Sequence, residues 1–159
     1  DVPLADLARL TDAFYIGGTK CGALFGEALV LVNPALGDHF RTCMKQRGDV
    51  LAKGWLMGLQ FYTLFQNGLY FDLARKADRQ AMEIKAAFQK AGIPLWVDSP
   101  TNQQFAVVSR EQEAALAKDF IFELSHAVDE GHNCIRFCTS WSTRDEEVAA
   151  LIEAIGRLN

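Results

Sequence analysis

The stretch FYIGGTKCG at residues 14–22 carries a lysine, Lys20, just beyond an apolar run and among glycines. A second apolar run covers residues 27–32 and stops at Asn33-Pro34. Apolar runs bounded by glycine and proline are typical of strands, so we expect two buried strands joined by a glycine-rich loop. Ligands of α/β proteins bind at strand ends, which makes this loop a candidate site.

The chemistry available to Lys20 depends on its surroundings. A lysine that is partly removed from water has a lowered pKa, and its neutral amine can form a Schiff base. The neighbouring glycines would let a bulky cofactor approach the backbone. The alternative is a surface lysine in a turn. The loop is not a P-loop, because that motif has a glycine before the lysine and Ser or Thr after it, whereas Lys20 lies between Thr19 and Cys21.

Composition narrows the class of protein. The chain has 159 residues, of which 50% are hydrophobic and 23% are charged, as expected for one ordinary globular domain. Its net charge of −4 argues against nucleic-acid binding. No apolar run approaches the roughly 18 residues of a membrane span. Four cysteines are too few for a disulfide scaffold, so we expect reduced thiols in a cytoplasmic protein.

The rest of the chain alternates between helical and strand patterns, which predicts a small α/β layer beside the first segment. A boundary is expected between Asn67 and Gly92. The expected helices cover residues 2–10, 36–65 (one long helix or two), 71–90, 110–118 and 144–157. The expected strands after residue 92 cover residues 93–97, 104–108, 120–124 and 134–139. Capping boxes are expected at Ser109 with Gln112 and at Thr143 with Glu146.

A second candidate, Arg136, lies inside the apolar run Ile135-Arg136-Phe137. Buried arginine is rare and is nearly always paired, and its forked donors suit a carboxylate. The alternatives are a structural salt bridge or a strand that exposes every second residue. Cys134 and Cys138 share a strand face, but no histidine has metal-ligand spacing to them, so no metal site is predicted.

Two runs resemble a known family. Residues 14–24, together with Gly26-Glu27-Ala28, resemble the cofactor-lysine segment of the threonine aldolase and β-eliminating lyase family of pyridoxal-phosphate enzymes. Residues 135–140 resemble the arginine-containing strand near the end of that family. The resemblance runs along essentially the whole chain but covers only the latter half of a family member. It implies an α/β fold class, the C-terminal portion of a fold like that of aspartate aminotransferase.

The resemblance also implies residue roles and domains. Lys20 would form the Schiff base with pyridoxal 5'-phosphate, Gly18 and Thr19 would lie at the cofactor, and Arg136 would bind the substrate carboxylate. A basic stretch would reach a neighbouring subunit's cofactor phosphate, here through Lys53 and less directly through Lys45 and Arg47. Three segments follow: the end of the large domain with the lysine loop and interface helices (1–67), a linking helix (68–92) and a small C-terminal α/β domain (93–159).

The activity implied is that of a lyase acting on a small amino acid. Our first choice is retro-aldol cleavage of a β-hydroxy-α-amino acid to glycine and an aldehyde, in a homodimer or homotetramer with shared active sites. β-Elimination is the alternative within the class, and a non-catalytic interaction module is the alternative outside it. The family's cofactor-ring residues would lie before Asp1, so we expect a C-terminal fragment that is inactive alone.

Overall fold

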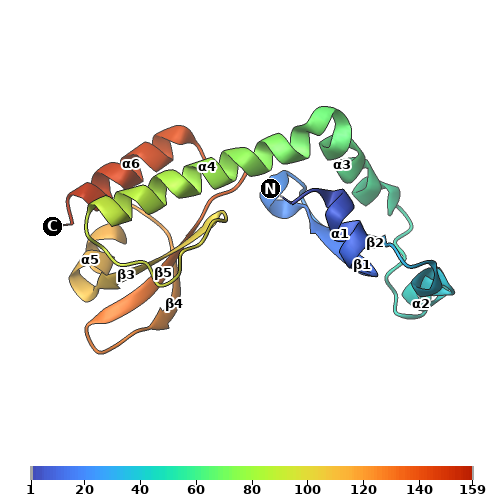
Figure 1. Ribbon diagram of the computed structural model, residues 1–159, viewed down its shortest axis with the longest axis horizontal. Helices are drawn as coiled ribbons and strands as arrows, with labels where there is room; N and C mark the ends of the chain where they lie inside the picture. Colours follow the sequence, from blue (N-terminus) through green and yellow to red (C-terminus); the bar gives the residue numbers. More distant parts are fainter. Residues whose placement is uncertain (1, 159) are drawn as a thin grey trace. The chain divides into compact units, whose positions relative to one another are not determined.

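A computed structural model describes residues 2–158, which form two compact units. Unit 1 ends at Tyr70 and unit 2 begins at Phe71. Each unit combines helices with a small antiparallel sheet (Figure 1), so the chain is a mixed α/β structure. The boundary falls inside the predicted linking segment 68–92, whose assignment as a linker between domains stays a prediction.

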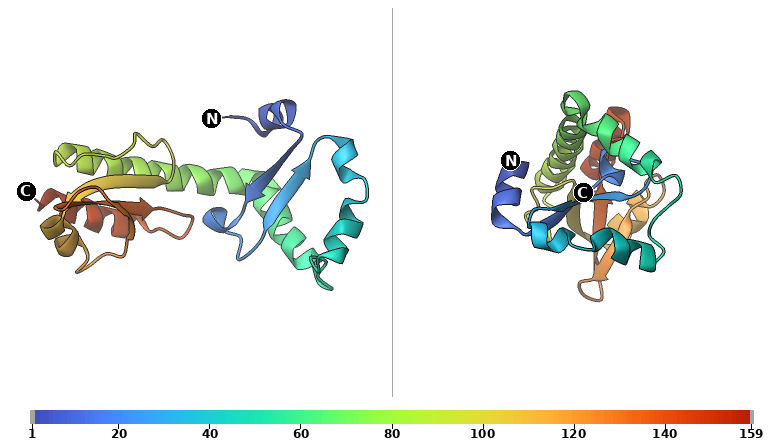
Figure 2. Two further views of the ribbon diagram at one scale, coloured as in Figure 1. Left: turned by 90° about the horizontal axis from the view of Figure 1, so that it is seen from below. Right: turned by 90° about the vertical axis from the view of Figure 1, so that its right-hand side faces the viewer.

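Unit 1 is built on a hairpin of β1 (Ala13–Gly17) and β2 (Glu27–Leu31), preceded by α1 (Leu4–Leu10). The two strands run antiparallel and side by side (Figure 2). Both strands were predicted, but the expectation that they are buried is wrong. Tyr15 and Leu29 lie opposite each other across the hairpin and are 71% and 50% exposed. Side chains alternate between the faces of a strand, and this unit leaves that face of its two-stranded sheet uncovered.

The predicted helical segment 36–65 resolves into two helices. Gly48, with φ of +80°, follows the end of the first, and its left-handed backbone cannot continue an α-helix. Asn67 and Gly68 also have positive φ and turn the chain into the next helix, as the Asn-Gly stop signal predicted. The elements of this stretch are η2 (Pro34–Gly37), α2 (Phe40–Gln46), α3 (Trp55–Phe65) and η3 (Gln66–Gly68).

Unit 2 contains a three-stranded antiparallel sheet in the order β3-β5-β4. The predictions of strands at residues 104–108 and 134–139 are confirmed. The prediction of a strand at 120–124 is wrong at its start, because the Phe120 amide donates to the Leu116 carbonyl and cannot join a ladder. The Phe120 and Phe122 side chains pack against the core instead. The strands are β3 (Gln103–Ser109), β4 (Glu123–Ala127) and β5 (His132–Cys138).

The predicted strand at residues 93–97 is not formed. Only Leu95 makes a bridge, to Ala106 of β3. The Pro94 carbonyl accepts from the Val107 amide, and the Trp96 amide donates to the Phe105 carbonyl. Proline has no N–H to extend this pairing, so the segment follows the edge of β3 as an irregular strip.

Three helices complete unit 2, and two of them test the predicted caps. The Ser109–Gln112 capping box is present at the start of α5. The predicted Thr143–Glu146 box is wrong by one residue: Glu147 accepts the Arg144 amide at 3.1 Å, while the Thr143 hydroxyl accepts from the Ser140 amide. The helices are α4 (Leu69–Lys90), whose first two residues belong to unit 1, α5 (Arg110–Leu116) and α6 (Asp145–Gly156).

The core of unit 2 lies between one face of the sheet and the adjacent pair α4 and α6 (Figures 1 and 2). Each element contributes at its own period: every second residue from the strands and every third or fourth from the helices. The phenylalanine rings of α4 and β5 approach with centroids 5.8 Å apart. The buried members are Ile84, Phe88, Ile93, Ala106, Val108, Leu116, Ile135, Phe137, Val148, Leu151 and Ile155.

Candidate functional site

Lys20 occupies the middle of a single 3₁₀ turn, η1 (Thr19–Cys21), directly after β1. The Gly18 carbonyl accepts two hydrogen bonds, from the Cys21 amide at 2.9 Å and from the Ala23 amide at 3.0 Å. Gly22 leaves the turn with φ of +106°, a conformation that favours glycine. The backbone on both sides of Lys20 is therefore fixed by local hydrogen bonds.

Helix α3 supports the loop that follows this turn. The Gln60 side chain accepts the Leu24 amide at 2.7 Å and donates to the Phe25 carbonyl at 3.3 Å. A Cβ on Gly18 would lie 2.6 Å from the Ala23 Cβ and 2.9 Å from the Phe61 ring. Gly18 is thus required for packing within the unit. Its predicted role at a cofactor stays a prediction.

Tyr70, at the start of α4, contacts the backbone just before the turn. Its hydroxyl donates to the Gly17 carbonyl at 2.8 Å, and its ring stacks on Phe65 with centroids 5.1 Å apart. Burial raises the pKa of Tyr70 to about 12, and the Cys21 side chain adds to this rise through its charge and its hydrogen bond to the hydroxyl. The hydroxyl therefore stays protonated, and able to donate, at any physiological pH.

The Lys20 side chain itself is exposed, and within residues 2–158 no hydrogen bond or ion pair involves it. Within unit 1 the side chain is therefore not withdrawn from water, as in the alternative of a surface lysine in a turn, and the Schiff-base role of Lys20 stays a prediction. Thr19 is exposed as well. Lys53 is exposed in the loop before α3. The cofactor roles of both residues stay predictions.

Arg136 lies on β5 of unit 2, so the two principal candidates belong to different units. The guanidinium donates to the Gln103 amide oxygen at 2.9 Å and forms an ion pair with Glu123. Those residues come from the two strands that flank β5, and Glu123 pairs with Arg136 in register. The alternative of a structural salt bridge is therefore realised. Arginine has five N–H donors, so these bonds leave others available for a carboxylate.

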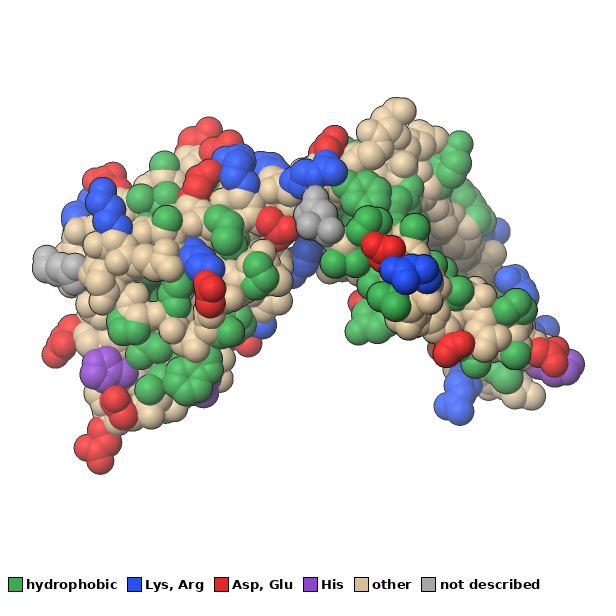
Figure 3. Space-filling model, in the orientation of Figure 1, with side chains coloured by type: hydrophobic (Ala, Val, Ile, Leu, Met, Phe, Trp, Pro, Cys, Tyr) green, Lys and Arg blue, Asp and Glu red, His purple; other side chains and the backbone are tan. Residues whose placement is uncertain are grey.

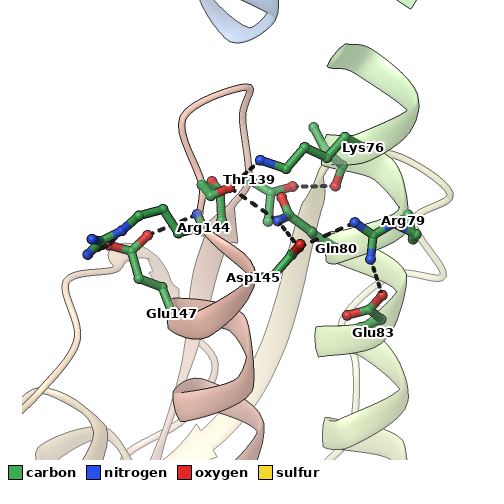
Figure 4. Close-up of polar contacts among 10 residues, drawn as sticks. Lys76, Arg79, Gln80, Glu83, Thr139, Arg144, Asp145 and Glu147 are labelled. Atoms are coloured by element: carbon green, nitrogen blue, oxygen red, sulfur yellow. Dashed lines mark hydrogen bonds and ion pairs between the residues drawn. The ribbon is translucent and has the colours of Figure 1, made fainter. Parts of the chain in front are cut away.

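The segment that follows Arg136 is anchored to α4 (Figure 4). The Thr139 hydroxyl donates to the Ala77 carbonyl at 2.7 Å. The buried Gln80 amide donates to the Thr143 carbonyl and, at 2.7 Å, to Asp145. These bonds hold the end of β5 and the start of α6 against one helix, which fixes the strand that carries Arg136.

Sequence reasoning missed four residues that hold the candidates in place: Gln60, Tyr70, Gln103 and Glu123. A signal existed for Glu123, because a paired arginine in a strand calls for an acid on a neighbouring strand. The others had none, since they meet their partners only across the tertiary fold.

Two further findings concern the described residues alone. No group of three or more His, Cys, Asp or Glu gathers in residues 2–158 as metal ligands would. In the same part of the chain, no helix is both long and apolar enough to cross a membrane.

Comparison with known proteins gives consistent matches to one group of enzymes. No family model matches the chain. It is 28% identical over 149 residues to a low specificity L-threonine aldolase of Pseudomonas sp., covering 91% of this chain and 42% of that protein. Its fold matches a threonine aldolase of Leishmania major with a TM-score of 0.96 and 42% identity, covering 99% of this chain and 46% of the other.

A more distant structure matches in fold alone. Serine palmitoyltransferase of Sphingomonas wittichii has a TM-score of 0.51 and 11% identity, covering 63% of this chain and 27% of the other. The chain spans less than half the length of the threonine aldolases it matches. The predicted fold class is confirmed, because the matched region is the C-terminal part of these transferase-like folds.

Proposed function

We propose that this chain, which is similar to threonine aldolases over less than half of their length, supplies Lys20 and Arg136 to a pyridoxal-phosphate-dependent lyase of that kind. The reaction proposed is retro-aldol cleavage of a β-hydroxy-α-amino acid to glycine and an aldehyde. The observation that carries the proposal is the Lys20 amine, which has no bonding partner in residues 2–158 although its backbone is fixed on both sides.

The residues of unit 1 fit attachment of pyridoxal phosphate through an amine. A lysine that holds an aldehyde covalently must be reachable and must not be engaged in an ion pair. The exposed Lys20 side chain meets both conditions. Gly18, Thr19 and Lys53 remain proposed contacts of the cofactor.

The cofactor, when bound, supplies an electron sink for the charge that develops at the substrate Cα. Lys20 would hold the cofactor between turnovers and release it to the incoming amino acid. Arg136 would bind the substrate carboxylate with the donors that Gln103 and Glu123 leave open. A carboxylate fixed in this way restricts rotation of the substrate, and such orientation is worth roughly 7–11 kcal/mol in well-arranged reactions.

The apolar surface of α3 supports the proposal of a homodimer or homotetramer. Trp55, Leu56 and Leu59 expose 63%, 43% and 50% of their surface. Hydrophobic side chains also gather over the visible face of unit 1 (Figure 3). Exposed patches of this kind mark interaction surfaces in soluble proteins.

The proposal is tested by borohydride trapping of pyridoxal phosphate on the longest natural polypeptide that contains this chain. Peptide mapping would compare Lys20 with Lys118, another exposed lysine, which lies in unit 2 and serves as the internal reference. We expect the adduct to form at Lys20 well before Lys118. Equal labelling of the two lysines would contradict the cofactor role.

Product analysis separates the reactions. The same polypeptide would be incubated with β-hydroxy-α-amino acids, and glycine, aldehyde and ammonia would be measured. We expect glycine and aldehyde in equal amounts. Release of ammonia without glycine would assign a β-elimination instead. The absence of every product, together with no selective adduct, would favour an interaction module.

A further inference from the structure

Tyr70 contacts both sides of the turn that carries Lys20. Its hydroxyl donates to the carbonyl of Gly17, three residues before the lysine, at 2.8 Å. It also hydrogen-bonds the side chain of Cys21, the residue directly after the lysine. Cys21 is buried, so this second contact lies on the inner side of the turn. One side chain therefore joins the entry and the exit of η1.

The Tyr70 ring is itself held. It stacks on Phe65 with centroids 5.1 Å apart and planes inclined by 22°. Asn67 and Gly68, both with positive φ, form the tight connection that brings Phe65 and Tyr70 together. The anchor thus depends on the join between α3 and α4, the same α3 whose Gln60 and Phe61 support the rest of the loop.

Within residues 2–158, the Lys20 side chain makes no hydrogen bond or ion pair that would fix its amine. The position of its Nζ is therefore set by the backbone of residues 17–21 and by side-chain rotation. In a covalent site, misplacement by 1 Å can cost about 100-fold in rate. A group that holds the backbone of the turn consequently acts on the amine, although it does not touch it.

We propose that Tyr70 is a positioning residue for Lys20, which fixes the turn by bonding the Gly17 carbonyl and the Cys21 side chain together. The inference rests on the proposed function, since it assigns a role toward the reaction of Lys20 with pyridoxal phosphate. It adds a residue from the start of α4 to a site otherwise built from residues 17–26 and α3.

The test compares Tyr70→Phe with the wild type in the longest natural polypeptide that contains this chain. Phenylalanine keeps the ring that stacks on Phe65 and removes only the hydroxyl. The matched control is Tyr62→Phe on α3, where the side chain is 66% exposed. Four quantities are measured: amide hydrogen exchange of residues 17–23, the rate of borohydride trapping at Lys20 relative to Lys118, the midpoint of thermal unfolding, and the pH at which the absorbance of the bound cofactor titrates.

We expect Tyr70→Phe to speed exchange of the Cys21 and Ala23 amides and to slow selective trapping at Lys20 about 10-fold. Tyr62→Phe should change neither. The absorbance of the bound cofactor should also titrate at a different pH in Tyr70→Phe, which a loss of global stability alone would not cause.

Three outcomes would overturn the inference. Unchanged exchange would mean that the hydroxyl does not hold the turn. Faster exchange with unchanged trapping and titration would mean that the turn is held but does not position the amine. An equal effect of Tyr62→Phe would mean a general loss of stability. A wild-type protein without selective Lys20 adduct would instead remove the proposed function, a result distinct from the three.

Discussion

Lys20 in unit 1 and Arg136 in unit 2 are held in opposite ways. At Lys20 the backbone is fixed by the Gly18 and Gly22 turn, while the side chain has no partner in the described residues. At Arg136 the backbone is an ordinary central strand, and the guanidinium is bonded to a residue on each flanking strand.

The difference matches the two kinds of chemistry proposed. An amine that must form and break a covalent bond needs freedom at its tip and a fixed base. A group that receives a carboxylate works best when its donors are already oriented, because less side-chain entropy is then lost on binding. The comparison can be tested by removing each feature separately.

The largest expected effect is that of Lys20→Ala. Selective trapping of pyridoxal phosphate should be lost completely, because the reacting amine is gone. The midpoint of thermal unfolding should stay unchanged, because the side chain is exposed and makes no hydrogen bond or ion pair within the described residues. Peptide mapping and calorimetry measure the two effects, and Lys118→Ala is the control. A large drop in stability would show that the Lys20 side chain is held after all.

Arg136→Lys should come next. Lysine keeps the charge but loses the forked donors, so the apparent affinity for an amino-acid substrate should fall about 10- to 100-fold, the worth of a charged hydrogen bond. Stability should fall by about 1 kcal/mol, since lysine can still pair with the exposed Glu123 while the Arg136 side chain is only one third exposed. Steady-state kinetics and denaturant unfolding measure these changes. The control is Arg157→Lys, which alters the exposed ion pair between Arg157, just after α6, and Glu153. It should leave the affinity for substrate unchanged.

Gly18→Ala tests the fixed backbone without touching the lysine. A methyl group there would collide with Ala23 and Phe61, so unit 1 should lose about 1–3 kcal/mol of stability, as overpacked sites do. Gly17→Ala is the matched control, because in the described residues no heavy atom beyond its two chain neighbours lies within 4 Å of the added methyl group. Denaturant unfolding of both variants decides the point. Equal stability would mean that α3 does not pack on the turn as described.

The smallest expected effect is that of Asp145, whose bond to Gln80 holds the start of α6 against α4. Hydrogen bonds from Gln80 and then Arg79 lower the pKa of Asp145. A carboxyl whose pKa is lower in the folded state than in the unfolded state stabilises the fold at pH values above its unfolded-state pKa. This stabilisation is lost as the pH falls through the folded-state pKa. Thermal unfolding of Asp145→Asn should therefore show a shallower loss of stability below about pH 4. Asp119→Asn is the control, and an identical slope in Asp145→Asn and wild type would contradict the role of this anchor.

Local sequence patterns were reliable where one short segment sets its own structure. The Asn67-Gly68 turn, the Ser109 capping box and helix α4 all depend on neighbours in the chain, and all three were predicted. The errors at residues 93–97 and 120–124 have one cause. Apolar runs there resemble strands, but Pro94 has no backbone N–H and the Phe120 N–H donates to the Leu116 carbonyl, so neither segment joins the ladder as a regular strand.

The sequence by itself pointed to the two candidates, the α/β class and the resemblance to threonine aldolases, because a lysine among glycines and an arginine in an apolar strand are visible as local patterns. The tertiary structure alone decided how each is held. Tyr70 lies fifty residues from Lys20, and Gln103 and Glu123 reach Arg136 only through the order β3-β5-β4. These partners meet only through packing and strand pairing between segments that are distant in the sequence. The pattern of residues within one segment therefore does not predict them.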